Sequence, residues 1–294
     1  MEPGMDGGPG SIGGGLRLAA PAKLNLGLEV TGHREDGFHD LATVFQTLEL
    51  ADTVRLVPTA DPACSLVLEG DPVGIPAGED NLALRAAKSY LHSNKAPTCE
   101  IHLEKLIPPG AGLGGGSSDA AAVLRGLQQL APAPLPEADL ALLAATLGSD
   151  VPFFLLGGTA WATGRGQELT GMTDLALPEI TLVLPPCDCP TPACFAALTE
   201  EERGPREPCN LNVWLSLWSN KRELALANRL LEPALRIRPE LEAVRDWTGA
   251  CGLPWGLSGS GSTFYLLGRT DREPPTGCRL LATAARPRKA LDRL

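Results

Sequence analysis

The sequence predicts a protein of mixed strands and helices in two domains, and three observations support this architecture. First, the chain has 294 residues, 44% of them hydrophobic, so it can bury a large core, and its length favours two domains over one. Second, apolar and polar residues alternate from Lys23 to Val30, which indicates a strand. Third, apolar residues recur every three or four positions from Ala120 to Leu130, which indicates a helix.

The first hundred residues are predicted to be rich in strands. Residues 1–15 contain seven glycines and are expected to form a disordered leader, so that the fold begins near Leu16. On the strand Lys23–Val30 the leucines share one face and Lys23 and Asn25 the other, which predicts a half-buried strand with both polar groups directed toward one cavity. The other elements predicted here are strands at Ala42–Leu50, Thr53–Val57, Ser65–Leu68 and Cys99–Leu106, and a helix at Leu82–His92 with Asp80 and Asn81 as caps.

The rest of the chain is predicted to be richer in helices. A helix is expected after a glycine-rich segment, with Ser118 and Asp119 as its caps and Pro132 as its stop. The pattern weakens at 170–178, which suggests a crossing between two lobes. The remaining predicted elements are a helix at Pro136–Leu147 ending at Gly148, a strand at Ile180–Leu184, a helix from Thr191, and long helices after a polar break at Glu201–Pro208.

Charge and composition exclude several classes of partner. Lys and Arg number 25 against 35 Asp and Glu, and the net charge of -10 would repel nucleic acid or an anionic membrane. No apolar run is long enough to span a bilayer, and the N-terminus lacks a signal-peptide pattern, so a cytoplasmic location is expected. A cysteine cluster without a CxxC pair or a nearby histidine disfavours zinc; its members are Cys187, Cys189, Cys194 and Cys209. The expected partner is a small molecule.

The segment from Pro109 to Asp119 reads PGAGLGGGSSD and is predicted to bind phosphate. Glycine amides can approach phosphate oxygens closely because no Cβ intervenes, and the following helix adds the positive end of its dipole. A dinucleotide-binding unit is one alternative, but the helix that follows leads into a second helix rather than a parallel strand. A Walker A loop would need a lysine where Ser117 stands. A merely structural glycine turn is the third alternative.

Three motifs, in order, resemble those of the GHMP kinases. They are PAKLNL at Pro21–Leu26, PPGAGLGGGSS at Pro108–Ser118, and LSGSGS at Leu257–Ser262. Together with DGFH at Asp36–His39 and GSDVP at Gly148–Pro152, they are similar to the branch of this superfamily that phosphorylates the 2-hydroxyl of 4-diphosphocytidyl-2-C-methyl-D-erythritol. The resemblance implies an ATP-dependent kinase of non-mevalonate isoprenoid biosynthesis that uses Mg²⁺, with no metal ligand assigned.

The resemblance also implies a two-lobed α+β fold. An N-terminal lobe at 16–165, similar to domain 2 of ribosomal protein S5, would bind ATP, and a ferredoxin-like lobe at 166–294 would bind the acceptor. Two other functions stay open: another GHMP small-molecule kinase, or a nucleotide-binding protein of this fold without catalysis. Phe38 and His39 argue against the first, because neither mevalonate nor homoserine has a base to stack on. Retention of both Lys23 and Asp150 argues against the second.

Roles for individual residues follow from the resemblance. Lys23 and Asp150 are the implied catalytic pair, with Asp150 accepting the hydroxyl proton and Lys23 orienting the same oxygen. The implied ATP-binding residues are Pro108, Pro109, Gly110, Ala111, Gly112, Leu113, Gly114, Gly115, Gly116, Ser117 and Ser118. The implied acceptor-binding residues are Asn25, Phe38, His39, Thr191, Phe195 and Gly259, where Phe38 and Phe195 would enclose the cytosine. Phe38 replaces the family's more common tyrosine, which keeps the ring for stacking but removes a hydroxyl.

Overall fold

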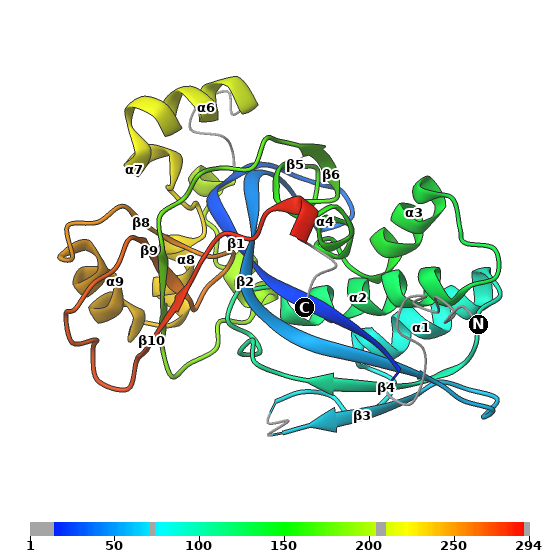
Figure 1. The fold of residues 1–294 in the computed structure, drawn as a ribbon. Helices are drawn as coiled ribbons and strands as arrows, with labels where there is room; N and C mark the ends of the chain where they lie inside the picture. The colour runs from blue at the N-terminus through cyan, green and yellow to red at the C-terminus, as the bar shows by residue number, and fades with distance from the viewer. Residues whose placement is uncertain (1–14, 71–73, 204–209, 291–294) are drawn as a thin grey trace, which may run out of the picture.

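The computed structural model describes residues 15–70, 74–203 and 210–290. It contains two β-sheets, each packed against its own helices (Figure 1). No helix in these ranges is long and apolar enough to cross a membrane. The predicted leader lies almost wholly outside the described residues, and so does Cys209 of the cysteine cluster. The α+β fold class is confirmed.

The first sheet has the order β3-β4-β2-β5-β6, with β1 paired to β2. The pairings are antiparallel except that of β3 with β4, which is parallel. Its strands are β1 (Leu16–His33), β2 (His39–Pro58), β3 (Ser65–Glu69), β4 (Cys99–Glu104), β5 (Thr159–Thr163) and β6 (Glu168–Gly171). Helices α1 (Leu82–Ser93), α2 (Gly115–Leu130), α3 (Glu137–Leu147) and α4 (Val151–Leu156) accompany this sheet, and α2 packs on β1 and β2.

The second sheet is antiparallel throughout, with the order β10-β7-β9-β8. Its strands are β7 (Ile180–Leu184), β8 (Trp255–Leu257), β9 (Phe264–Leu267) and β10 (Arg279–Thr283). Between β7 and β8 lie α5 (Thr191–Ala196), η1 (Glu200–Glu202), α6 (Leu211–Asn220), α7 (Arg222–Ala225), α8 (Leu231–Ile237) and α9 (Leu241–Gly249). A last short helix, η2 (Arg288–Ala290), follows β10. Strand β6 belongs to the first sheet, so the two sheets divide between 171 and 180; the domain boundary at 165 stays a prediction.

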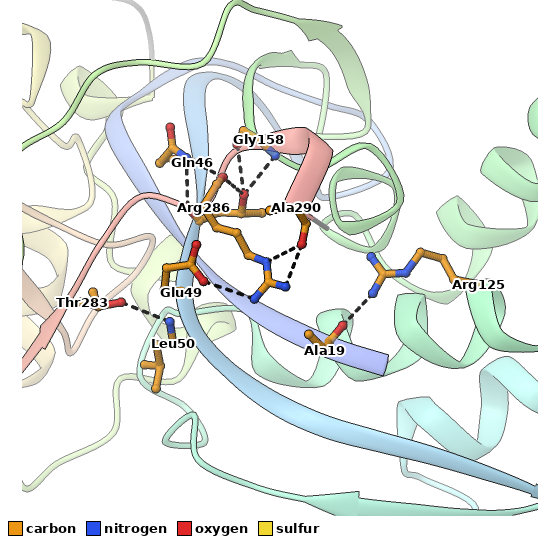
Figure 2. A network of polar contacts seen from close by, with 10 residues as sticks. Ala19, Gln46, Glu49, Leu50, Arg125, Gly158, Thr283, Arg286 and Ala290 are labelled. Atoms are coloured by element: carbon orange, nitrogen blue, oxygen red, sulfur yellow. Dashed lines mark hydrogen bonds and ion pairs between the residues drawn. The ribbon is translucent and has the colours of Figure 1, made fainter. Parts of the chain in front are cut away.

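The two sheets share buried contacts. Leu24 and Leu26 of β1 belong to the same apolar cluster as Ile180 and Leu182 of β7. The chain after β10 also returns to the first sheet, where the buried Arg286 pairs with Glu49 and donates to the carbonyl of Ala290 (Figure 2). These contacts join the two sheets.

Several predicted elements differ from the structure. Strand β1 is buried on both faces through most of its length, because the second sheet packs against the face that carries Leu24 and Leu26 while Lys23 and Asn25 are buried on the other face. The two strands predicted at 42–57 form one continuous strand, β2, and the helices after 210 are short. Ser118 and Asp119 do not cap α2, since this helix starts at Gly115 after a left-handed Gly114. Asn81, in contrast, caps α1 as predicted by accepting a 2.9 Å bond from the amide of Ala83.

Candidate active site

A cleft of about 880 Å³ lies where β1, the glycine loop, the start of α4 and the start of α5 meet. Every site residue predicted from the sequence lines this cleft except Ser118, which is buried in the first turn of α2. Residues from position 23 to position 260 contribute to the same wall, so the fold gathers segments that are distant in the chain. The cleft is therefore the candidate active site.

Lys23 and Asp150 face each other inside the cleft. The Lys23 Nζ lies 3.7 Å from Asp150 Oδ2, and the lysine side chain is 5% exposed against 31% for the aspartate. The Nζ also donates a 2.6 Å bond to Asn25 Oδ1, and Asn25 Nδ2 donates a 3.0 Å bond to Thr43 Oγ1. Burial lowers the pKa of Lys23 from its ordinary value, although the Asp150 carboxylate opposes this shift. Asn25, itself bonded to Thr43, thus holds the lysine nitrogen beside the Asp150 carboxylate.

The backbone explains why these two side chains meet. The pairing of β1 with β2 shifts register between Pro21 and Lys23, and the Lys23 amide donates a 2.9 Å bond to the carbonyl of Leu113 in the glycine loop. Asp150 occupies the position before α4, but its carboxylate makes no capping bond to that helix. The Asp150 carboxylate is therefore available to the cleft.

The glycine loop packs so closely that side chains would not fit. Gly112 has φ +75°, and a Cβ there would lie 2.2 Å from the carbonyl oxygen of Ser258. Gly114 has φ +74°, and a Cβ there would lie 2.8 Å from the Phe154 ring. These conformations open the loop directly onto the N-terminus of α2, a helix of 16 residues. The arrangement satisfies the requirements of a phosphate site at a helix terminus.

A turn from the second sheet closes the cleft beside the loop. Ser258 Oγ donates a 2.9 Å bond to the carbonyl of Gly112. Gly259 has φ +56°, and a Cβ there would lie 3.2 Å from Lys23 Nζ and 3.4 Å from Asn25 Oδ1. A side chain at position 259 would therefore meet Lys23, and a glycine there leaves that lysine its position.

A buried charge cluster beneath the loop was not predicted from the sequence. Lys105 forms ion pairs with Asp52 and with Asp119, the latter at 2.6 Å. Burial raises the pKa of Asp119 to about 8; the charge of Lys105 opposes this shift and that of Asp52 adds to it. The pKa of Lys105 is also raised, because the two carboxylates outweigh the effect of its burial. Lys105 and Asp119 line the cleft. Asp52 lies in β2, Lys105 follows β4 and Asp119 lies in α2, so no local sequence pattern indicated the cluster.

The aromatic end of the cleft differs from the arrangement expected. The His39 ring stacks on Phe195 with 5.2 Å between centroids, and Thr191 Oγ1 contacts Ser260 Oγ at 2.9 Å. Phe38 is 51% exposed and lies under the guanidinium of Arg165. Among the described residues, the Phe195 ring stacks on His39 and not on Phe38. Burial lowers the pKa of His39, and the charges of His33 and Arg203 lower it further. The predicted aromatic residues meet in one place, but His39 rather than Phe38 faces Phe195.

Known proteins match the chain along most of its length. The model of the GHMP kinases N terminal domain matches residues 81–158. The 4-diphosphocytidyl-2-C-methyl-D-erythritol kinase of Thermus thermophilus is 45% identical over 275 residues, which cover 92% of this chain and 93% of that protein. The chain belongs to the family of these kinases. The resemblance found in the motifs is therefore confirmed.

Solved structures agree with membership of this kinase family. A crystal structure of 4-(cytidine 5'-diphospho)-2C-methyl-D-erythritol kinase superposes with a TM-score of 0.75 at 40% identity, covering 92% of this chain and 99% of that one. The mevalonate kinase of Methanococcus jannaschii gives a TM-score of 0.67 at 14% identity, covering 93% of this chain and 99% of that one, which indicates a shared fold. The two-lobed GHMP kinase fold is thus confirmed, and the dinucleotide-binding alternative is wrong, because α3 rather than a parallel strand follows α2.

Two further features bear on ligands of this kinase. Across the described parts of the chain, no group of three or more His, Cys, Asp or Glu side chains is placed to hold a metal ion. Within the same parts, Ser118 Oγ and Asp119 Oδ1 are buried without a hydrogen-bond partner. The two orphaned oxygens lie in the first turns of α2, next to the glycine loop.

Proposed function

We propose that this chain transfers the γ-phosphate of ATP to the 2-hydroxyl of 4-diphosphocytidyl-2-C-methyl-D-erythritol, a step of the non-mevalonate route to isopentenyl diphosphate. The observation that carries the proposal is the Lys23–Asp150 pair at 3.7 Å beside a glycine loop that opens onto α2. The family of the chain supports the choice of acceptor.

The acceptor hydroxyl would lie between Lys23 and Asp150. Asp150 accepts the hydroxyl proton, the oxygen bonds to the γ-phosphorus, and the bond from that phosphorus to the β-phosphate oxygen breaks to release ADP. Lys23 orients the attacking oxygen and offsets negative charge on the transferred group. Because phosphoryl transfer passes through a loose transition state, this positioning matters more than the strength of the base.

ATP would lie along the glycine loop with its phosphates at the start of α2. The amides of Gly112 to Gly116 and the dipole of α2 supply the positive potential. The cleft continues from the loop to Gly74–Pro76 and to the start of α1, where Asn81 and Leu82 line it. This end has room for the adenine base, so the nucleotide would extend away from the aromatic end.

Magnesium fits the residues around the loop. The ion binds through one or two protein oxygens together with substrate phosphates and water, rather than through a carboxylate cage. The orphaned oxygens of Ser118 and Asp119 are of this kind, and they adjoin the loop that would hold the phosphates. A bound Mg²⁺ would neutralise phosphate charge and would favour the ionised form of Asp119 despite its burial.

The cytidine end of the acceptor would occupy the aromatic end of the cleft. Phe38 and Phe195 offer ring faces for stacking, and His39 offers ring nitrogens to the edge of the base. Thr191 and Gly259 lie between this end and Lys23. Binding of a base between Phe38 and Phe195 would require His39 to leave the Phe195 ring, on which it now stacks.

The decisive experiment incubates the protein with ATP, Mg²⁺ and a panel of alcohols that includes mevalonate, homoserine and the cytidine diphosphate acceptor, and identifies products by mass. A product from the cytidine diphosphate acceptor alone supports the proposal. Phosphorylation of mevalonate or homoserine instead would assign the chain to another GHMP kinase activity. ATP binding with no product from any alcohol would identify a nucleotide-binding protein without catalysis.

Variants of the catalytic pair test the assignment of roles. Lys23→Ala and Asp150→Asn are each expected to lower kcat by about a hundredfold or more, because each removes a group that contacts the reacting oxygen. Lys95→Ala, which removes an exposed lysine just after α1, serves as the control and should leave kcat unchanged. Unchanged turnover in both active-site variants would contradict the assignment.

A further inference from the structure

The cations that line the cleft differ in what neutralises them. Lys23 faces Asp150, and Lys105 is paired with two carboxylates. Arg165 also lines the cleft, but within the described residues it makes no ion pair, and its guanidinium instead lies 4.6 Å from the centre of the Phe38 ring. The charge of Arg165 does act on the carboxylate of Asp36, but among the described residues no ion pair holds the guanidinium. In an acidic protein, a cation in a substrate cleft that no ion pair holds is a candidate to bind an anionic group.

The backbone of Arg165 is anchored beside the catalytic pair. Arg165 lies in the turn between β5 and β6, where its amide donates a 2.8 Å bond to Gln167 Oε1 and the carbonyl of Gly164 accepts a 2.7 Å bond from the Leu41 amide. The next residue, Gly166, is so close to the reaction centre that a Cβ on it would lie 3.8 Å from Asp150 Oδ1. Arg165 therefore lies in the chain immediately before the residue that approaches Asp150, and its guanidinium lies over Phe38.

The position of Arg165 suits an acceptor that reaches from the aromatic end to Asp150, an argument that rests on the proposed function. With its base at the aromatic end and its hydroxyl at Asp150, the acceptor must place its diphosphate between these two points. A guanidinium presents parallel N–H donors that suit phosphate oxygens, and it pairs with them more strongly than with the face of an exposed ring. Arg203 also lines the cleft and its charge acts on His39, but it follows η1, whereas Arg165 lies in the turn next to Asp150.

We propose that Arg165 binds the diphosphate of the acceptor and thereby selects a cytidine diphosphate derivative over an uncharged nucleoside. On substrate binding, the guanidinium leaves the Phe38 ring for the phosphate oxygens, while its backbone stays fixed beside Asp150. Arg165 is in this way a specificity-determining residue for the reaction and takes no part in proton transfer.

The test compares CDP with cytidine as probes. Affinities are measured by calorimetry with a non-hydrolysable ATP analogue at saturation, so that CDP cannot occupy the ATP site. The unmodified protein is expected to bind CDP more tightly than cytidine. Arg165→Met should lower the affinity for CDP by about tenfold or more, because a charge-assisted pair with phosphate is lost, and should change the affinity for cytidine by less than about twofold. Arg165→Lys should recover part of the CDP affinity by keeping the charge.

Kinetics and a matched control complete the test. Arg165→Met should raise KM for the acceptor while KM for ATP is unchanged. Arg269→Met removes an arginine that is 77% exposed and lies outside the cleft, and it should change neither affinity. If Arg165→Met lowered the affinities for CDP and cytidine equally, the inference would be overturned. Arg165 would then act only by holding the Phe38 ring in position. If the unmodified protein bound neither probe, the proposed acceptor itself would be wrong.

Discussion

At the scale of single residues, Lys23 shows how burial and charge compete. Water is excluded from its ammonium, which disfavours the charged form, and the carboxylate of Asp150 only partly compensates. Asn25 and Gly259 lie against the same nitrogen, so the lysine has little freedom to turn toward solvent. A side chain held in this way can act on one oxygen atom of a substrate with little reorganisation.

The lowered pKa of Lys23 predicts the pH dependence of turnover. An ordinary lysine loses its proton near pH 10.5, and Lys23 loses its proton at a lower pH, so kcat should fall as the pH rises toward 10.5. The guanidinium introduced by Lys23→Arg stays charged throughout, so whatever activity that variant retains should lack this alkaline decline. The measurement is kcat against pH for both proteins. A decline of equal midpoint in the variant would show that another group titrates.

At the scale of elements, the glycine loop depends on its contact with the turn at 258–261. The carbonyls of Ser258 and Gly261 lie within 2.8 Å of the position of a Cβ on Gly112. The loop follows a strand of the first sheet and the turn lies between strands of the second, so the proposed phosphate site is assembled only when the sheets are packed together. A strained loop conformation of this kind costs about 1–3 kcal/mol in a residue other than glycine.

Gly112→Ala tests this contact. The methyl group would strain the loop and push it away from the turn, so affinity for an ATP analogue should fall by at least about tenfold, with a loss of stability of about 1–3 kcal/mol. Gly78→Ala is the control, because its Cβ would meet nothing within 4 Å and its φ is ordinary. Calorimetry measures the affinity and urea unfolding the stability. Tight ATP binding by Gly112→Ala would show that the loop does not need the contact.

At the scale of the whole molecule, the segment after β10 connects the second sheet back to the first. The side chain of Thr47, fully buried in β2, donates a 2.8 Å bond to the carbonyl of Arg286 and accepts a 3.0 Å bond from the amide of Gly158. Leu50 donates to Thr283 Oγ1, as Figure 2 also shows. These bonds lie away from the cleft, so they hold the sheets together without touching substrate.

Thr47→Val should separate stability from activity. Valine has the same shape but leaves the buried amide of Gly158 without this partner and the carbonyl of Arg286 with the 3.3 Å bond from Gln46, which costs about 1–3 kcal/mol in the free energy of unfolding. Turnover of the folded protein should be unchanged. Thr146→Val, at an exposed position of α3, should change stability by no more than about 0.5 kcal/mol. Urea midpoints and kcat at low temperature measure the two effects, and equal midpoints for the two variants would contradict the prediction.

Much of the site could be predicted because its residues carry local signals. The glycine run, the alternation that places Lys23 with Asn25, and the position of Asp150 before a helix can each be recognised within about ten residues of chain. The second-sheet strands β8, β9 and β10 and the hairpin β5–β6 were not predicted, because each strand is at most five residues long and its pairing is set by distant segments.

The sequence by itself determined the class of the protein and predicted the phosphate loop, Lys23 and Asp150, because each of these lies in a motif of residue types at short, fixed spacings. Only the tertiary structure decided which other charges meet there. Asp52, Lys105 and Asp119 come from separate elements, and Arg165 reaches Phe38 only because β5 pairs with β2. Contacts between residues far apart in the chain follow from sheet pairing and packing, and no local pattern encodes them.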